Sequence, residues 1–282
     1  MKTSLADVSN QIQKFWSPLF VKELREKLLL ASLVNKDYQG EIRQKGDTVK
    51  VSQVIAPTGE LRTVGVDADV FESQKIQTQQ VDIKADKRAV AAYEVEDLVD
   101  LQSQIDKDDS EVRQSLLYAV EKQINDYLYS LVAPSASAPD HTLVKTDFNA
   151  GVLTELRMLA SQAKWMKNKP WYILADPSYT KDMLDSQVLT SADFVSDQPV
   201  VGGQISQKRY GWNILEDDSR PTDYAIAFHP DFLHLVTQTE AQFKLSDLHS
   251  QKKFGYLLSV DIIFGAKLGI AGNVKHILIT GS

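Results

Sequence analysis

Residues 41–84 contain too few apolar side chains to build a hydrophobic core, and this limits how the chain can fold. Val49 and Val51 alternate with polar residues, which predicts a strand. After turn signals at Pro57–Gly59, a second polar stretch over 71–83 has few apolar positions. An isolated two-stranded hairpin is marginally stable in water. We therefore expect a long two-stranded arm that lies on another surface.

A long helix over Asp109–Leu131 is the strongest periodic signal in the sequence. Asp108 and Glu111 have the spacing of a capping box, and Ala133–Pro134 ends the pattern. At 1.5 Å per residue the helix is about 35 Å long, enough to cross a domain. The apolar residues recur at three- and four-residue spacing, and we expect the first four and Leu128 to face a core. The set is Val112, Leu116, Val120, Ile124, Tyr127, Leu128 and Leu131.

The rest of the sequence predicts a mixture of helices and strands. A helix over Pro18–Ala31, capped by Ser17, precedes the arm, and a strand over Ala89–Val95 is apolar on both faces, as in a doubly buried strand. The Pro/Ser/Ala-rich stretch 134–139 indicates a linker into a second, mixed α/β lobe. The elements expected there are helices over Val152–Trp165 and Asp176–Asp185 and strands over Trp171–Leu174, Trp212–Leu215, Tyr224–Phe228, Ser259–Phe264 and Lys275–Ile279.

Composition excludes several classes of protein. The 31 Lys and Arg against 38 Asp and Glu give a net charge of −7, which argues against a dedicated nucleic-acid binder. The absence of cysteine excludes disulfides and cysteine-ligated metal centres. No stretch has the roughly 18 apolar residues of a membrane helix, and the polar start does not resemble a signal peptide.

No residue pattern predicts an active site. Ser161 and Lys164 have a spacing used in some acyl-transfer enzymes, but a solvated helix face explains it as well. No two histidines have the four-residue spacing of a zinc helix, and we expect the histidines at surfaces or caps, with a turn at His229–Phe232. The acidic clusters at 67–72 and 106–111 lack calcium-loop spacing. We predict no catalytic residue, cofactor or metal.

The order of these features resembles the major capsid proteins of tailed bacteriophages, which have the HK97-like fold. The resemblance extends over nearly the whole chain and rests on the order of several moderately specific motifs. These are Leu33–Ile42 leading to Gly46–Val51, Ala91–Leu98 ahead of the long helix, Ala227–Pro230 and Phe264–Leu268.

The resemblance implies an α+β fold with four parts: an N-terminal arm, an extended β-hairpin E-loop, a P-domain with a long spine helix and a mixed α/β A-domain. Carried over by position, the parts are N-arm 1–40, E-loop 41–84, P-domain 85–133, A-domain 134–236, and a return through the P-domain and C-terminal strands over 237–282.

The resemblance implies a structural subunit, not an enzyme, that assembles as pentamers and hexamers into an icosahedral phage head around double-stranded DNA. It further implies a virion protein assembled in the host cytoplasm, with a separate scaffolding protein, a portal, weak non-specific contacts to DNA and no membrane. The subunit-interface residues expected at the arm tip are Pro57, Thr58, Gly59, Glu60, Leu61, Arg62 and Val66.

The required Lys, Asn and Glu of cross-linking relatives have no match, so we predict no cross-linking. Two alternatives to a phage capsid subunit remain at this point. An encapsulin-like cargo compartment shares the fold and fits the same sequence. From another class, a small-molecule hydrolase or binding enzyme with a helical lobe predicts a convergent polar pocket in the second lobe.

Overall fold

The computed structural model describes most of the chain outside the first 27 residues. The described residues are 28–37, 48–61, 73–96, 110–136, 138–165, 167, 169–190, 208–219, 224–237, 242–269 and 276–281.

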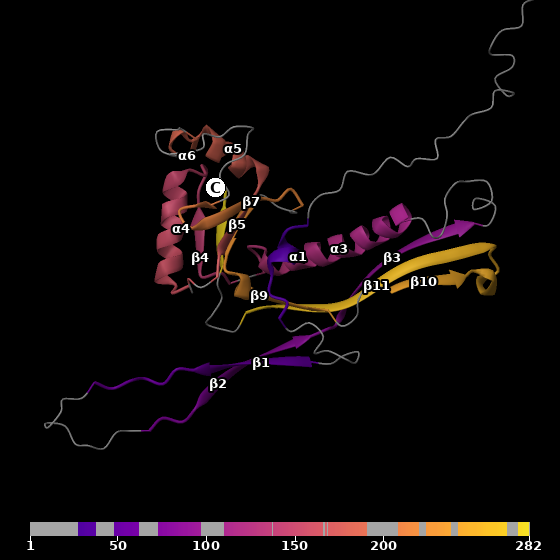
Figure 1. Ribbon diagram of the computed structural model, residues 1–282, viewed down its shortest axis with the longest axis horizontal. Coiled ribbons are helices and arrows are strands. Elements are labelled where there is room, and N and C mark those ends of the chain that lie inside the picture. The colour runs from indigo at the N-terminus through magenta and orange to yellow at the C-terminus, as the bar shows by residue number, and fades with distance from the viewer. Residues whose placement is uncertain are drawn as a thin grey trace, which may run out of the picture.

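The described part forms an elongated body, a compact lobe and a projecting hairpin (Figure 1). A long helix, α3 (Ser110–Val132), runs along the elongated sheet. The compact lobe surrounds a six-stranded sheet at one end of that body. The antiparallel hairpin of β1 (Thr48–Ile55) and β2 (Gln77–Lys84) extends away from both.

The predicted long helix is confirmed within one residue at each end, since α3 covers Ser110–Val132. Its apolar stripe packs against β3 (Lys87–Glu96), β11 (Gly255–Leu268) and the short helix α1 (Leu30–Leu33). Most of the N-terminal helix expected over Pro18–Ala31, and Asp108 of the expected capping box, lie outside the described residues.

The elongated sheet has the order β10-β11-β3, with β9 (Leu233–Thr237) paired to the far end of β11. The described strands of this sheet pair antiparallel, and β10 covers Gln242–Asp247. Alternate residues of β11, including Leu258, Val260 and Phe264, are buried in the core cluster that contains α3. The 14-residue length of β11 lets a single strand hold three partners.

The expectation that the strand at 89–95 is buried on both faces is wrong. Among the described strands β3 lies at an edge of the sheet, and of the described helices α3 packs on one of its faces. Ala89 and Ala91 on the covered face are buried and partly buried, whereas Val90 on the other face is 46% exposed. Continuous apolar sequence predicted two covered faces, but the sheet has one covering layer.

The six-stranded sheet of the compact lobe is mixed, with the order β4-β12-β8-β5-β7-β6. Helix α4 begins after Asn149, whose side chain accepts hydrogen bonds from the first turn, and α5 begins after Asp176 in the same way. The remaining bounds are β4 His141–Val144, α4 Ala150–Gln162, β5 Trp171–Ala175, α5 Pro177–Asp185, α6 Gln187–Thr190, β6 Lys208–Arg209, β7 Trp212–Glu216, β8 Tyr224–Phe228 and β12 His276–Thr280.

The strand pairing divides the C-terminal part differently from the expected boundary at 236/237. β9 ends at Thr237 and pairs with β11, so it joins the elongated sheet. After β11 the chain leaves the elongated sheet, and β12 inserts between β4 and β8 in the compact lobe. The reason is the continuously apolar sequence of β12, whose first four residues are buried in the middle of the six-stranded sheet.

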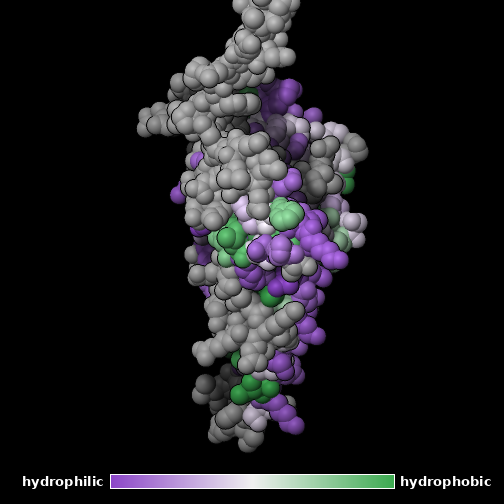
Figure 2. Space-filling model, turned by 90° about the vertical axis from the view of Figure 1, so that its right-hand side faces the viewer, coloured by the Kyte–Doolittle hydropathy of each residue, from purple (hydrophilic) through white to green (hydrophobic). Residues whose placement is uncertain are grey.

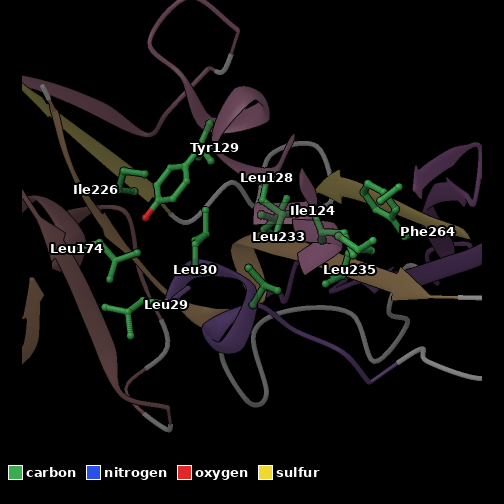
Figure 3. Packing of buried hydrophobic residues seen from close by; sticks show 14 of the residues in the cluster. Leu29, Leu30, Ile124, Leu128, Tyr129, Leu174, Ile226, Leu233, Leu235 and Phe264 are labelled. Carbon is green, nitrogen blue, oxygen red and sulfur yellow. The ribbon is translucent and has the colours of Figure 1, made fainter. Parts of the chain in front are cut away.

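One apolar cluster joins the helix, the elongated sheet and the inner face of the compact lobe (Figure 3). Leu30 from α1 and Leu128 from α3 lie between the two sheets, near Leu174 of β5 and Leu233 of β9. The other face of the six-stranded sheet has its own cluster, in which Trp171 and Trp212 pack beneath α4. The elongated body and the compact lobe therefore share one apolar core.

Candidate assembly surfaces

The hairpin is in full register over eight residue pairs, from Thr48 with Lys84 to Ile55 with Gln77. Beyond the strands, the Thr58 backbone N–H donates to Gln74 Oε1 at 3.0 Å, and Gln74 Nε2 donates to the Thr58 carbonyl at 3.3 Å. These bonds join the two limbs where strand pairing has ended. The hairpin thus stays a defined, narrow projection beyond its last paired strand residues.

The outer part of the hairpin exposes apolar side chains to solvent. Leu61 is 103% exposed, Ile76 83% and Val54 64%. Of the expected tip residues, those that the structure describes are all exposed, whereas Arg62 and Val66 lie outside the described residues. The described tip residues are Pro57, Thr58, Gly59, Glu60 and Leu61. An exposed apolar hairpin with no core beneath it is a surface that another molecule can cover.

The base of the hairpin is fixed to the body. Val49, Ile83 and Ala85 are buried with Val236 of β9 in a small separate cluster. The hairpin therefore has a buried base and an exposed outer half, which is the form of an arm held at one end.

The five core residues expected on the long helix lie on its packed side. Leu116, Val120, Ile124 and Leu128 are buried, and Val112 is partly buried against the same cluster. The same face carries residues that the sequence reasoning did not select, Asn125, Tyr129 and Val132, which are also fully buried. The sequence did not predict Val132 as a core residue, because the expected helix ended at Leu131.

A buried polar network connects α3 to the loop after β7. The Tyr129 hydroxyl and the Ser219 hydroxyl both donate to the Asp217 carboxylate, the latter at 2.6 Å. Asn125 Nδ2 donates to Ser219 Oγ at 3.1 Å, and Asn125 Oδ1 accepts from the Ala31 N–H of α1 at 3.3 Å. Since a buried carboxylate is costly without donors, this network fixes how the compact lobe sits on the long helix.

A second set of polar contacts, centred on Asp231, connects the segment after α1 with the loop before β5. Asp231 Oδ1 accepts from Asn35 Nδ2 at 2.9 Å and from Lys169 Nζ at 2.8 Å. Burial alone would raise the pKa of Asp231, but these two hydrogen bonds and the Lys169 charge bring the pKa below its ordinary value. His229 caps the turn, because its Nδ1 accepts from the Asp231 N–H at 3.2 Å. The expected turn at His229–Phe232 is confirmed.

The expectation that the histidines lie at surfaces or caps is wrong for two of them. His234 and His276 are buried because they lie in strands, β9 and β12, that contribute to the core. Burial lowers the pKa of both, and that of His276 to about 4. These imidazoles pack in the core, where burial favours their neutral form.

The residues considered for catalysis do not come together. Ser161 is on α4, but Lys164 lies beyond the end of the helix in a left-handed conformation, and both are exposed. Within the described ranges, no three His, Asp or Glu side chains are grouped as a metal site would need. Over the same ranges, no helix is both long enough and apolar enough to cross a bilayer.

The far end of the elongated sheet carries a second exposed surface that the sequence reasoning missed. Phe254 is 72% exposed, and on β10 Leu245 is 54% and Phe243 39% exposed. Figure 2, which looks onto that end, shows small separate groups of hydrophobic residues among hydrophilic ones. Phe243 and Leu245 alternate with polar residues on one short strand, and this pattern predicts a two-faced strand without saying which face is covered.

Solved phage structures share this fold over the full chain. One from Mycobacterium phage Che8 is 19% identical with a TM-score of 0.75, covering 96% of this chain and 98% of that one. The capsid structure of the cyanophage P-SCSP1u is 12% identical with a TM-score of 0.76, covering 98% and 94%. The capsid asymmetric unit of cyanophage Pam1 is 13% identical with a TM-score of 0.72, covering 99% and 97%.

Neither a protein-family model nor a curated protein matches the sequence. The likeness to the phage structures is therefore found by comparing folds, not by comparing sequences with family models or curated proteins. The expected α+β fold of the phage capsid proteins is confirmed.

Proposed function

We propose that the chain is the major capsid protein of a tailed bacteriophage, a structural subunit that self-assembles into an icosahedral head around double-stranded DNA. The observation that carries the proposal is the hairpin, whose outer half is exposed and apolar while its base is buried. The full-length likeness to phage capsid structures supports it.

In this proposal the parts of the fold have separate tasks. The hairpin is the E-loop, α3 is the spine helix of a P-domain that includes the elongated sheet, and the six-stranded lobe is the A-domain. The shared core and the buried Tyr129–Asp217 hydrogen bond support a subunit whose P-domain and A-domain move together as one rigid unit. Strand pairing supports assigning β9 to the P-domain and β12 to the A-domain, in place of a boundary at 236/237.

The energetic basis of the shell is repeated contact. The side chains of Val54, Leu61 and Ile76 are exposed in the subunit. Covering them with a neighbouring surface lowers the free energy by about 25 cal/mol for each Å² of apolar area buried. A standard interface of roughly 1,600 Å² repeated around closed symmetry turns modest contacts into a stable assembly. Pentamers and hexamers of the subunit would provide that closure.

We further propose the expected partners and place of assembly. The head forms in the host cytoplasm with a separate scaffolding protein and a portal, and the subunit contacts the packaged DNA weakly. The net charge of −7 supports the last point, because few surplus cations are present to hold phosphates.

Imaging of the purified protein tests the function directly. Size-exclusion chromatography should place assembled protein in the void volume, and negative-stain electron microscopy should show closed shells. A compact monomer under every assembly condition would overturn the proposal. Shells that co-purify with a cargo protein instead of DNA would favour the encapsulin-like alternative.

A further inference from the structure

A basic hollow of about 300 Å³ lies on the compact lobe, between α4, the loop before β5 and the β6–β7 turn. Three of the lining residues that the structure describes are cationic, in a chain whose net charge is −7. The lining residues are Arg157, Lys167, Lys169, Pro170, Trp171 and Gly211.

The Arg157 guanidinium is held in place by its surroundings. Its central carbon lies 4.4 Å from the centre of the Trp171 ring, a cation–π contact. On another side it meets the backbone of Gly211, where an added Cβ would lie 2.3 Å from Arg157 Nη1. Tyr210 and Gly211 both have positive φ, 49° and 83°, as in the two-residue turns that connect tight hairpins. The glycine thus lets the turn approach the guanidinium closely.

Two of the three cations differ from the third, because no described carboxylate pairs with them. Lys169 is paired with Asp231 at 2.8 Å. Arg157 and Lys167 have no carboxylate partner in the part of the chain that the structure describes. A fixed guanidinium beside the ammonium group of the exposed Lys167 in a small hollow is suited to one planar anion, which a guanidinium binds through two parallel N–H donors.

We propose that this hollow binds a carboxylate side chain from a second copy of the chain. The inference rests on the proposed function, since it needs neighbouring copies. With 38 Asp and Glu against 31 Lys and Arg, a sister surface offers carboxylates in excess. A nucleic-acid backbone would require a row of cations spaced along several phosphates, whereas Arg157 and Lys167 form a single site.

The test removes both charges in the full-length protein and measures how well its shells resist salt. We expect Arg157→Gln with Lys167→Gln to lower the NaCl concentration that dissociates assembled shells at least twofold, or to prevent closure, with the subunit's thermal melting unchanged. The matched control is Lys145→Gln with Lys181→Gln, which makes the same charge change at residues already paired with Glu155 and Asp185 on this lobe.

Each outcome separates this inference from the proposed function. Wild-type protein that never forms shells overturns the function, whereas double-variant shells with wild-type salt resistance overturn only the carboxylate site. Variant shells that close normally but retain less DNA would show that the hollow binds phosphate instead, which also overturns it. If the double variant does not fold, Lys167→Gln alone provides the test, because this residue is exposed and outside any helix or strand.

Discussion

Gly265 on β11 lies directly against the main chain of Lys84 at the end of the hairpin. A Cβ built on Gly265 would come within 1.9 Å of the Lys84 carbonyl oxygen and 2.7 Å of its carbonyl carbon. The two residues are far apart in sequence, and their backbones meet where the arm leaves the body. The only side chain that allows this approach is a hydrogen atom.

Gly265→Ala should therefore destabilise the base of the arm. The added methyl group meets backbone atoms that cannot rotate away, so we expect the free energy of unfolding to fall by about 1–3 kcal/mol. Denaturant unfolding measures this, with Gly281→Ala as the control because nothing lies within 4 Å of a Cβ there. Equal losses in the two variants would contradict the close contact.

Val120→Asp should destabilise the core beneath the long helix. Val120 is fully buried, and an unpaired carboxylate at its position should cost about 3 kcal/mol or more. The control is Gln114→Asp, which introduces the same residue at an exposed position of α3. Thermal melting of both variants tests the prediction, and an unchanged melting temperature for Val120→Asp would refute it.

Tyr129→Phe should weaken the connection between the long helix and the compact lobe. The change removes one donor to the buried Asp217 carboxylate while it keeps the aromatic ring, so the expected loss is about 1–3 kcal/mol. Tyr93→Phe, at a residue 45% exposed, should cost far less. Chemical denaturation of the unassembled subunits compares the two.

Leu61→Asp with Ile76→Asp should prevent assembly without changing the stability of the subunit. Both side chains are largely exposed, so the free energy of unfolding should change by less than about 0.5 kcal/mol. Charges in a surface that a neighbour must cover should nevertheless reduce the fraction in the void volume. Ser52→Asp with Thr78→Asp, at exposed polar positions of β1 and β2 in the same hairpin, should assemble more readily. Normal shells from the Leu61/Ile76 variant would argue against the arm as an interface.

Stability should fall as the pH is lowered from about 6.5 to 4. Burial lowers the pKa of His276 from 6.5 to about 4, so between these values the unfolded chain binds more protons than the folded one. The stability that His276 contributes is complete above pH 6.5 and decreases by up to about 3 kcal/mol at pH 4. Burial of His234 acts in the same direction.

His276→Leu should flatten the pH dependence of the unfolding free energy. The substitution keeps an apolar side chain of similar size next to Phe232 and removes the titrating group. His249→Leu is the control because that residue is exposed. Urea unfolding at pH 4.5 and pH 7 for each variant gives the difference, and an unaltered slope for His276→Leu would exclude this histidine as the cause.

Local patterns in the sequence predicted the main elements because their causes are local. The three- and four-residue spacing of Val112, Leu116 and Val120 specifies one helical face over a few turns. The alternation at Val49 and Val51, and the lack of apolar residues beyond them, predicted an arm with no core of its own. A resemblance spread over several motifs then indicated the capsid fold that the comparison with solved structures confirmed.

What only the tertiary structure decided involves residues that are distant in sequence. Tyr129 and Asp217 are 88 positions apart and Asn35 and Asp231 are 196 apart, so no local spacing reveals either pair. The open face of β3, the return of β12 to the other sheet and the burial of His276 depend on which layers cover each strand. Side-chain periodicity determines which face of a helix or strand is apolar, whereas long-range packing determines what covers that face. In the outer half of the hairpin, the apolar side chains of Val54, Leu61 and Ile76 stay exposed in the single subunit.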